Sequence, residues 1–160
     1  MVQPAPKPVP EGMNTLTTML FFNGNCREAI EFYQKAFGAE LMGPIAPGPD
    51  GKGVMHAMLK FGNSQIMLAD AMPGEWEKGP EKFATASLFM YVEDCDSIYK
   101  RATAAGCQVR MPMADMFWGD RMGKVKDPYG HCWVIATYKY VLTPEEMQKG
   151  QQEWLKSLKH

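Results

Sequence analysis

Residues 26–41 read CREAIEFYQKAFGAEL, and 68 positions later residues 94–109 read DCDSIYKRATAAGCQV. In both stretches apolar residues recur at the spacing of one helix face, and a glycine follows the last residue expected to be helical. The same offset aligns Gly62 with Gly130 and Ile66 with Val134. Turn glycines and apolar positions agree together, which predicts that the chain consists of two copies of one structural unit.

Each copy has the same expected order of one strand, one helix and three further strands. The strands expected in the first copy cover residues 17–23, 39–45, 54–61 and 64–70. Those expected in the second copy cover residues 86–92, 108–111, 122–126 and 131–138. The helices are expected to end at Gly38 and Gly106, and Asn25 is expected to cap the first helix. The prediction is an α+β fold of two tandem βαβββ modules that form a cup-shaped mixed sheet.

Composition suggests where these modules begin and end. A proline-rich stretch over residues 1–13 is expected to form an extended arm, and one domain is expected over residues 14–142. That domain divides into module one, a linker and module two at residues 14–71, 72–82 and 83–142. Residues 143–160 begin with a capping-box motif, which predicts a C-terminal helix. The apolar face of this helix predicts a homodimer, with packing on the domain's own sheet as the alternative.

Composition also excludes several classes of protein. The formal net charge is −1 and the basic residues are scattered, so no nucleic-acid partner is expected. No apolar run approaches the roughly 18 residues that span a bilayer, so no membrane partner is expected either. The four cysteines are widely spaced and form no C-x-x-C pair, which is typical of thiols in a reducing cytoplasm. We therefore expect a cytoplasmic protein.

Several motifs resemble those of the vicinal oxygen chelate superfamily, which includes glyoxalase I, extradiol dioxygenases and bleomycin-resistance proteins. They include EAIEFY at residues 28–33, FGAE at 37–40, MHA at 55–57, FWGDR at 117–121 and DPYGH at 127–131. These motifs are similar to those of the PhnB-like subgroup, and the resemblance covers residues 14–148. It implies that each module curls into a half-barrel, and that the two together form a cup for a small molecule.

Metal-dependent members of this family place one ligand on the first strand and one on the last strand of each module. Carried onto this chain, the four positions fall at Met19, Ile66, Ser87 and Val134. Aliphatic side chains do not bind a divalent ion, and a serine hydroxyl is a weak ligand. We therefore expect no cofactor, and a divalent metal only at a site elsewhere. The four side chains would then form an apolar floor beneath the ligand.

His56 and Asp70 are the candidates for acid–base chemistry. With a turn at Gly62 and Asn63, they are expected to lie nearly opposite each other in the hairpin. Such a pair serves either as a general base or as a structural hydrogen bond.

Trp118 and Arg121 are candidates for ligand contact, on a loop before a strand of module two. Arg121 offers a planar fork for a carboxylate or phosphate, and Trp118 offers a stacking face. In the structural alternative, Arg121 holds the loop through Asp120 or Asp127, and Trp118 is an apolar lid.

Two functions remain open from the sequence. The first is a binding protein that sequesters a small molecule in the cup, as bleomycin-resistance members do. The second is a glyoxalase-like lyase, isomerase or transferase that acts on a small metabolite, with His56, Asp70 and Arg121 as its candidate residues. The unsuitable metal positions and the 14 methionines favour binding.

Overall fold

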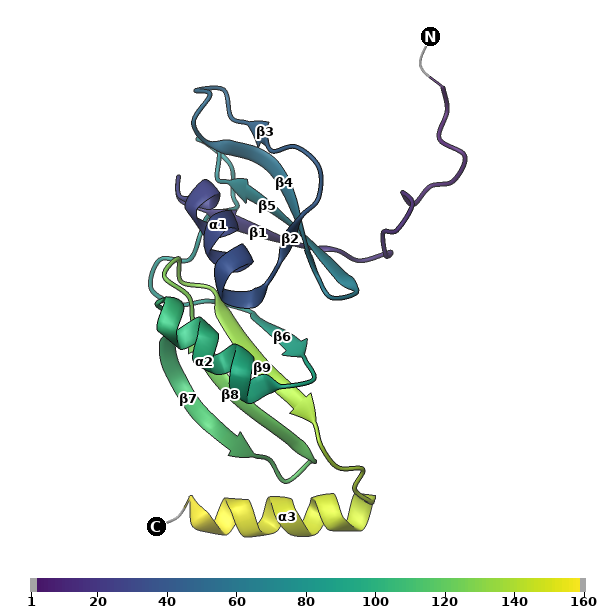
Figure 1. Cartoon of the computed structure of the whole chain (residues 1–160), viewed down its shortest axis with the longest axis vertical. Coiled ribbons are helices and arrows are strands. Elements are labelled where there is room, and N and C mark those ends of the chain that lie inside the picture. Colours follow the sequence, from purple (N-terminus) through teal and green to yellow (C-terminus); the bar gives the residue numbers. More distant parts are fainter. Residues whose placement is uncertain (1–2, 159–160) are drawn as a thin grey trace. The chain divides into compact units, whose positions relative to one another are not determined.

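The computed structural model describes residues 3–158 and divides into two compact units, Met1–Gly79 and Pro80–His160 (Figure 1). Residues 1–2 of the expected arm and 159–160 of the expected terminal helix lie outside the described residues. Each unit contains one mixed sheet and a helix that follows the first strand. The predicted α+β fold of two tandem βαβββ modules with a C-terminal helix is confirmed.

The first unit has a sheet in the strand order β1-β5-β4-β2, with β3 paired to β4. Its elements are β1 (Thr18–Phe22), α1 (Cys26–Phe37), β2 (Glu40–Leu41), β3 (Ala46–Pro47), β4 (Val54–Phe61) and β5 (Ser64–Asp70). Strands β1 and β5 run parallel, whereas β4 runs antiparallel to its neighbours. The β4–β5 hairpin has its expected bounds. The strand expected over residues 39–45 is only β2, because Gly43 takes a φ of 74° and Pro44 lacks a backbone donor.

Helix α1 buries its apolar face against this sheet. The ring of Tyr33 is fully buried and lies 6.3 Å from the ring of Phe22 and 6.2 Å from that of Phe61, measured between centroids. Each large side chain removed from water in this way contributes about 1.5–3 kcal/mol. Gly38 ends the helix as expected, since it takes a φ of 68° and its N–H donates to the carbonyl of Gln34.

The second unit repeats this topology in the strand order β6-β9-β8-β7. Its elements are β6 (Ser87–Tyr91), α2 (Cys95–Ala105), β7 (Gln108–Asp115), β8 (Asp120–Lys126), β9 (Cys132–Tyr138) and α3 (Pro144–Ser157). The first and last strands of the module are again parallel neighbours. Strand β7 extends beyond the expected residues 108–111 because Pro112, which has no backbone N–H, lies in an edge strand where no donor is needed.

The terminal helix α3 begins with the predicted capping box. The N–H of Glu146 donates to Thr143 Oγ1 over 3.2 Å, and Glu146 Oε2 accepts the N–H of Thr143 over 2.8 Å. The ring of Trp154 lies 6.0 Å from that of Phe117, which belongs to the β7–β8 turn. Helix α3 therefore contacts its own unit at Phe117, through Trp154 and Gly150.

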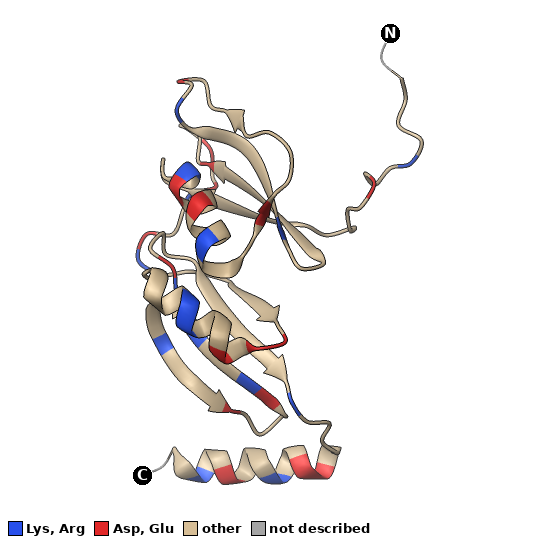
Figure 2. Cartoon of the chain, viewed as in Figure 1, with Lys and Arg blue, Asp and Glu red and all other residues tan. Residues whose placement is uncertain are grey.

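Charge and helix length bear on the partners of the chain. Figure 2 shows acidic and basic residues interspersed in each unit. Among residues 3–158, no helix is both long enough and apolar enough to cross a membrane.

Candidate functional site

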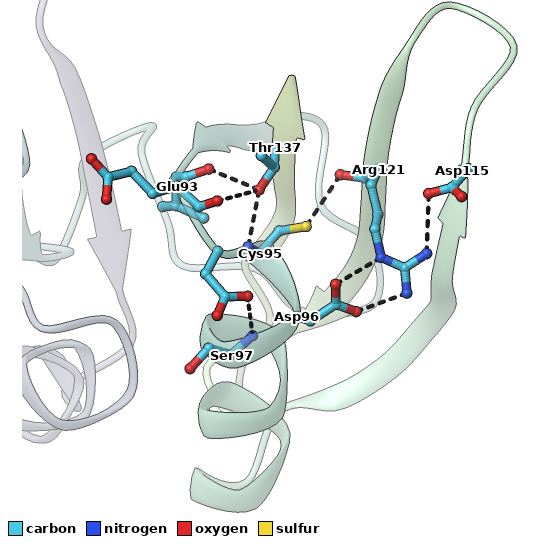
Figure 3. A network of polar contacts seen from close by, with 9 residues as sticks. Glu93, Cys95, Asp96, Ser97, Asp115, Arg121 and Thr137 are labelled. Atoms are coloured by element: carbon cyan, nitrogen blue, oxygen red, sulfur yellow. Dashed lines mark hydrogen bonds and ion pairs between the residues drawn. The ribbon is translucent and has the colours of Figure 1, made fainter. Parts of the chain in front are cut away.

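The second sheet has one face covered by α2 and one face turned away from it. Thr137 Oγ1 accepts the N–H of Cys95, the first residue of α2, over 3.0 Å, so Thr137 lies on the covered face (Figure 3). Side chains alternate along a strand, and paired residues share a face. The opposite face is here called the helix-distal face, and it carries Ser87, Phe89, Tyr91, Asp120, Met122, Lys124, Lys126, Cys132, Val134, Ala136 and Tyr138.

The centre of the helix-distal face is apolar. Met122, Val134 and Ala136 are buried, and Met111, Met116 and Trp118 pack against them. Methionine side chains are unbranched and polarisable, so they adapt to ligands of different shape. This surface suits an apolar or aromatic molecule.

A carboxylate adjoins the apolar centre. Asp120 is only 3% exposed, and its Oδ2 accepts the indole N–H of Trp118 over 2.8 Å and the hydroxyl of Tyr91 over 2.9 Å. The hydrogen bond to Asp120 raises the pKa of Tyr91 above its ordinary value, so the phenol stays protonated and continues to donate. The carboxylate thus holds the indole and the phenol in fixed orientations.

Arg121 is directed to the other face of the same sheet. Its Nε and Nη2 donate to the two carboxylate oxygens of Asp96 over 2.7 and 2.8 Å, and its Nη1 donates to Asp115 over 3.1 Å (Figure 3). These hydrogen bonds hold the pKa of the Asp96 carboxyl below its ordinary value. Arg121 therefore joins the first turn of α2 to the end of β7, and it does not lie beside Trp118.

The expected structural partners of Arg121 are wrong. Asp120 accepts from Trp118 and Tyr91 instead, as described above. Asp127 accepts the backbone N–H groups of Tyr129 and His131 and the indole N–H of Trp133. Asp96 and Asp115 accept the hydrogen bonds of Arg121 instead. Asp96 is distant from Arg121 along the chain, so local sequence patterns did not indicate this pairing.

His56 and Asp70 do not pair across the hairpin as expected. The register of the hairpin ends at the pair of Ala57 with Leu68, so His56 and Asp70 both lie beyond the last paired residues. The carboxylate of Asp70 instead accepts three backbone N–H groups, those of Gly24, Cys26 and Val54, over 2.9, 3.0 and 2.8 Å. Asp70 thus fixes the start of α1 and the start of β4.

The four positions that correspond to metal ligands in the family do not all lie on the helix-distal side of their sheets. Ile66 lies on the face of the first sheet covered by α1, because it shares that face with Asp70, and it is buried. Met19 lies on the opposite face of the first sheet, whereas Ser87 and Val134 lie on the helix-distal face of the second. The expectation that Ile66 forms part of a ligand floor is therefore wrong.

The side chains at these positions do not fit a divalent ion. Thioether, aliphatic and hydroxyl groups are poor or impossible ligands for zinc, nickel or iron. In the described part of the chain, no group of three or more His, Cys, Asp and Glu side chains could hold a metal ion.

Tyr91 and Asp120 were missed as site residues. The alternation of Phe89 and Tyr91 along β6, two exposed aromatic residues on one face of a strand, was the available signal. Asp120 gave no such signal, because one of its two partners, Tyr91, comes from a strand distant in sequence.

Comparison with known proteins gives consistent results. Residues 15–135 match the family model of the Glyoxalase/Bleomycin resistance protein/Dioxygenase superfamily. An uncharacterized protein of Mycobacterium tuberculosis is 37% identical over 125 residues, covering 75% of this chain and 72% of that protein. Protein YjdN of Escherichia coli is 30% identical over 145 residues, covering 78% of this chain and 95% of its own length.

Solved structures agree in fold. A protein from Pseudomonas aeruginosa has a TM-score of 0.64 at 26% identity, covering 80% of this chain and 100% of that one. A PhnB protein from Bacillus cereus has a TM-score of 0.62 at 22% identity, covering 78% of this chain and 99% of that one. At this identity the second likeness concerns the fold alone.

Proposed function

The chain belongs to the glyoxalase/bleomycin resistance protein/dioxygenase superfamily, and from this premise we propose that it is a binding protein for a small molecule. The ligand contacts the helix-distal face of the second sheet, with Trp118, Ser87 and Val134 among the residues of that face. The cup between the two modules stays a prediction from the family resemblance.

One observation carries the proposal. Asp120 fixes Trp118 and Tyr91 beside a methionine-rich surface, so an adaptable apolar area adjoins a few oriented polar groups. Small-molecule sites have this composition, in which apolar contact supplies affinity and a few polar groups orient the ligand.

The alternative of a glyoxalase-like enzyme has less support. Two of its three candidate residues, Asp70 and Arg121, already serve structural contacts that join a helix to its sheet. The third, His56, lacks the carboxylate partner that the sequence assigned to it, since the Asp70 carboxylate accepts three backbone N–H groups instead. We therefore propose no reaction for this chain.

The indole N–H of Trp118 reports directly on the proposed site. In a heteronuclear NMR spectrum the four tryptophan side chains give separate indole signals, which Trp118→Phe and Trp76→Phe assign. We expect small aromatic compounds from a fragment collection to shift the Trp118 signal and to leave that of Trp76, which is 98% exposed, unchanged. If fragments bind while the Trp118 signal stays fixed throughout, the helix-distal face is not the site.

A further inference from the structure

Asp120 is a buried carboxylate that has no cationic side chain as a partner. No lysine, arginine or histidine among residues 3–158 forms an ion pair with it, and the neighbouring Arg121 pairs with Asp96 and Asp115 on the other face. Its two donors, the indole of Trp118 and the phenol of Tyr91, are both neutral. A buried charge without an opposite charge is costly, so this position favours a bound cation.

One oxygen of this carboxylate remains available. Both neutral donors are directed at Oδ2, and no group of the described residues donates to Oδ1. Within the same residues, no buried side-chain oxygen lacks a hydrogen-bond partner, so Oδ1 keeps contact with solvent. Oδ1 is therefore the oxygen of Asp120 that a ligand would contact.

Exposed aromatic rings lie on the same face as the carboxylate. Phe89 and Tyr91 lie next to each other with ring centroids 5.0 Å apart, and Tyr138 is the register partner of Asp120 in β9. These three rings are 50%, 61% and 59% exposed, which is unusual for three large aromatic residues on one face of a sheet. Ring faces attract cations through their quadrupole, and cages of such rings bind alkylated ammonium groups.

The basic side chains of β8 on this face are distant. Lys124 and Lys126 lie four and six residues further along β8 than Asp120, so the nearer of them is roughly 13 Å away at about 3.3 Å per residue. That separation exceeds the Debye length of about 8 Å at physiological ionic strength, so Lys124 does little to neutralise Asp120.

From these observations we propose that the cluster of Phe89, Tyr91, Trp118, Asp120 and Tyr138 binds an organic cation, namely an alkylated ammonium group on an apolar or aromatic body. The ammonium group contacts Oδ1 and the exposed rings, and the apolar body contacts Met111 and Met116, which are partly buried and pack against the buried Met122. This inference rests on the proposed function and adds to it the charge of the ligand.

Two compounds of equal shape test whether the site prefers a positively charged ligand. Para-hydroxyphenyltrimethylammonium and para-tert-butylphenol differ only in the positive nitrogen that replaces a carbon atom. Both are titrated against the full chain, and the dissociation constants come from the shift of the Trp118 indole signal. We expect the cation to bind about 10-fold or more tightly than the neutral compound, the scale expected of a partly desolvated cation among aromatic rings.

Substitutions then identify which residues produce the preference for the cation over the neutral compound. Asp120→Asn keeps the shape and removes the charge, so we expect it to lower the preference several-fold and to leave the part that the aromatic rings contribute. Glu93→Gln removes an equal charge from an exposed position outside the cluster and is expected to preserve the preference. Tyr138→Leu alters an exposed ring and keeps Asp120, so it remains informative if Asp120→Asn fails to fold. It is expected to weaken binding of the cation several-fold and of the neutral compound less.

The outcomes separate the two proposals. Equal affinity for both compounds, or an unchanged preference in Asp120→Asn, overturns the organic-cation proposal, although binding at Trp118 would still support the proposed function. In the case of a misfolded Asp120→Asn protein, an unchanged preference in Tyr138→Leu overturns it as well. If neither compound nor any other fragment shifts the Trp118 signal, both proposals are wrong.

Discussion

Asp70 and Thr137 hold equivalent positions in the two units, since each caps the helix of its module from the end of the last strand. Asp70 Oδ1 accepts the N–H of Cys26 over 3.0 Å, and Thr137 Oγ1 accepts the N–H of Cys95 over 3.0 Å. Each acceptor satisfies a donor of the first helical turn that has no partner within the helix. The start of each helix is therefore attached to the sheet by a side chain distant in sequence.

The first prediction concerns this cap. Asp70→Ala removes the acceptor for three backbone N–H groups and is expected to lower the free energy of unfolding by about 2–4 kcal/mol. Asn25→Ala is the control, because Asn25 makes no side-chain cap hydrogen bond, and it should cost under about 0.5 kcal/mol. Urea denaturation of both variants measures the two values. Equal losses would mean that the cap is local to Asn25, as the sequence predicted.

The features that the sequence predicted correctly are those that depend on interactions between residues close together in the chain. The bounds of β4 and β5 follow from their apolar content and from the turn at Gly62, and those of α2 from its periodicity and Gly106. Helix and strand propensities act over a few residues, and so do turn and cap signals. For this reason the order of elements and the repeat could be predicted from the sequence alone.

The orientation of individual site residues could not be predicted in this way. Ile66 and Val134 align at a constant offset, yet Ile66 faces α1 and Val134 lies on the helix-distal face. Because side chains alternate with a period of two, a register difference of one residue between the modules reverses the face. A sequence comparison at one offset does not detect such a difference, since both faces of these strands are apolar.

The second prediction concerns pH and the contact of Asp96 with Arg121. The hydrogen bonds of Arg121 hold the pKa of Asp96 below its unfolded value, so this contact stabilises the fold above the unfolded pKa of about 4. The stabilisation is lost as the pH falls through the lowered folded pKa. Asp96→Asn is therefore expected to reduce the loss of stability between about pH 5 and pH 3, measured by urea denaturation.

Two further variants complete this experiment. Arg121→Gln should reduce the loss of stability at acidic pH to the same extent as Asp96→Asn, because either change removes the same contact. It should lower the melting temperature and leave ligand affinity largely unaltered, since Arg121 faces away from Trp118. Glu153→Gln, on α3, serves as the control for loss of one carboxylate. If the stability of Asp96→Asn falls with pH as much as that of the wild-type protein, the pair has no stabilising role.

The last prediction concerns the exposed apolar residues at the end of α3. Trp154, Leu155 and Leu158 are 49%, 47% and 61% exposed, although Trp154 also contacts Phe117. Water contact with this much apolar surface is unfavourable, and most soluble oligomers pair such surfaces about a twofold axis. We predict a homodimer in which this end of α3 lies at the interface, and light scattering at micromolar concentration measures the mass.

A charge placed in the predicted interface should separate the subunits. Leu155→Glu puts a carboxylate into that contact, and we expect a monomer that keeps the wild-type helix content, because Leu155 is half exposed within its own chain. Gln152→Glu adds the same charge at an exposed polar position of α3 and should leave the dimer intact. A wild-type protein that is monomeric at micromolar concentration would contradict the prediction, and a Leu155→Glu variant that stays dimeric would place the interface elsewhere.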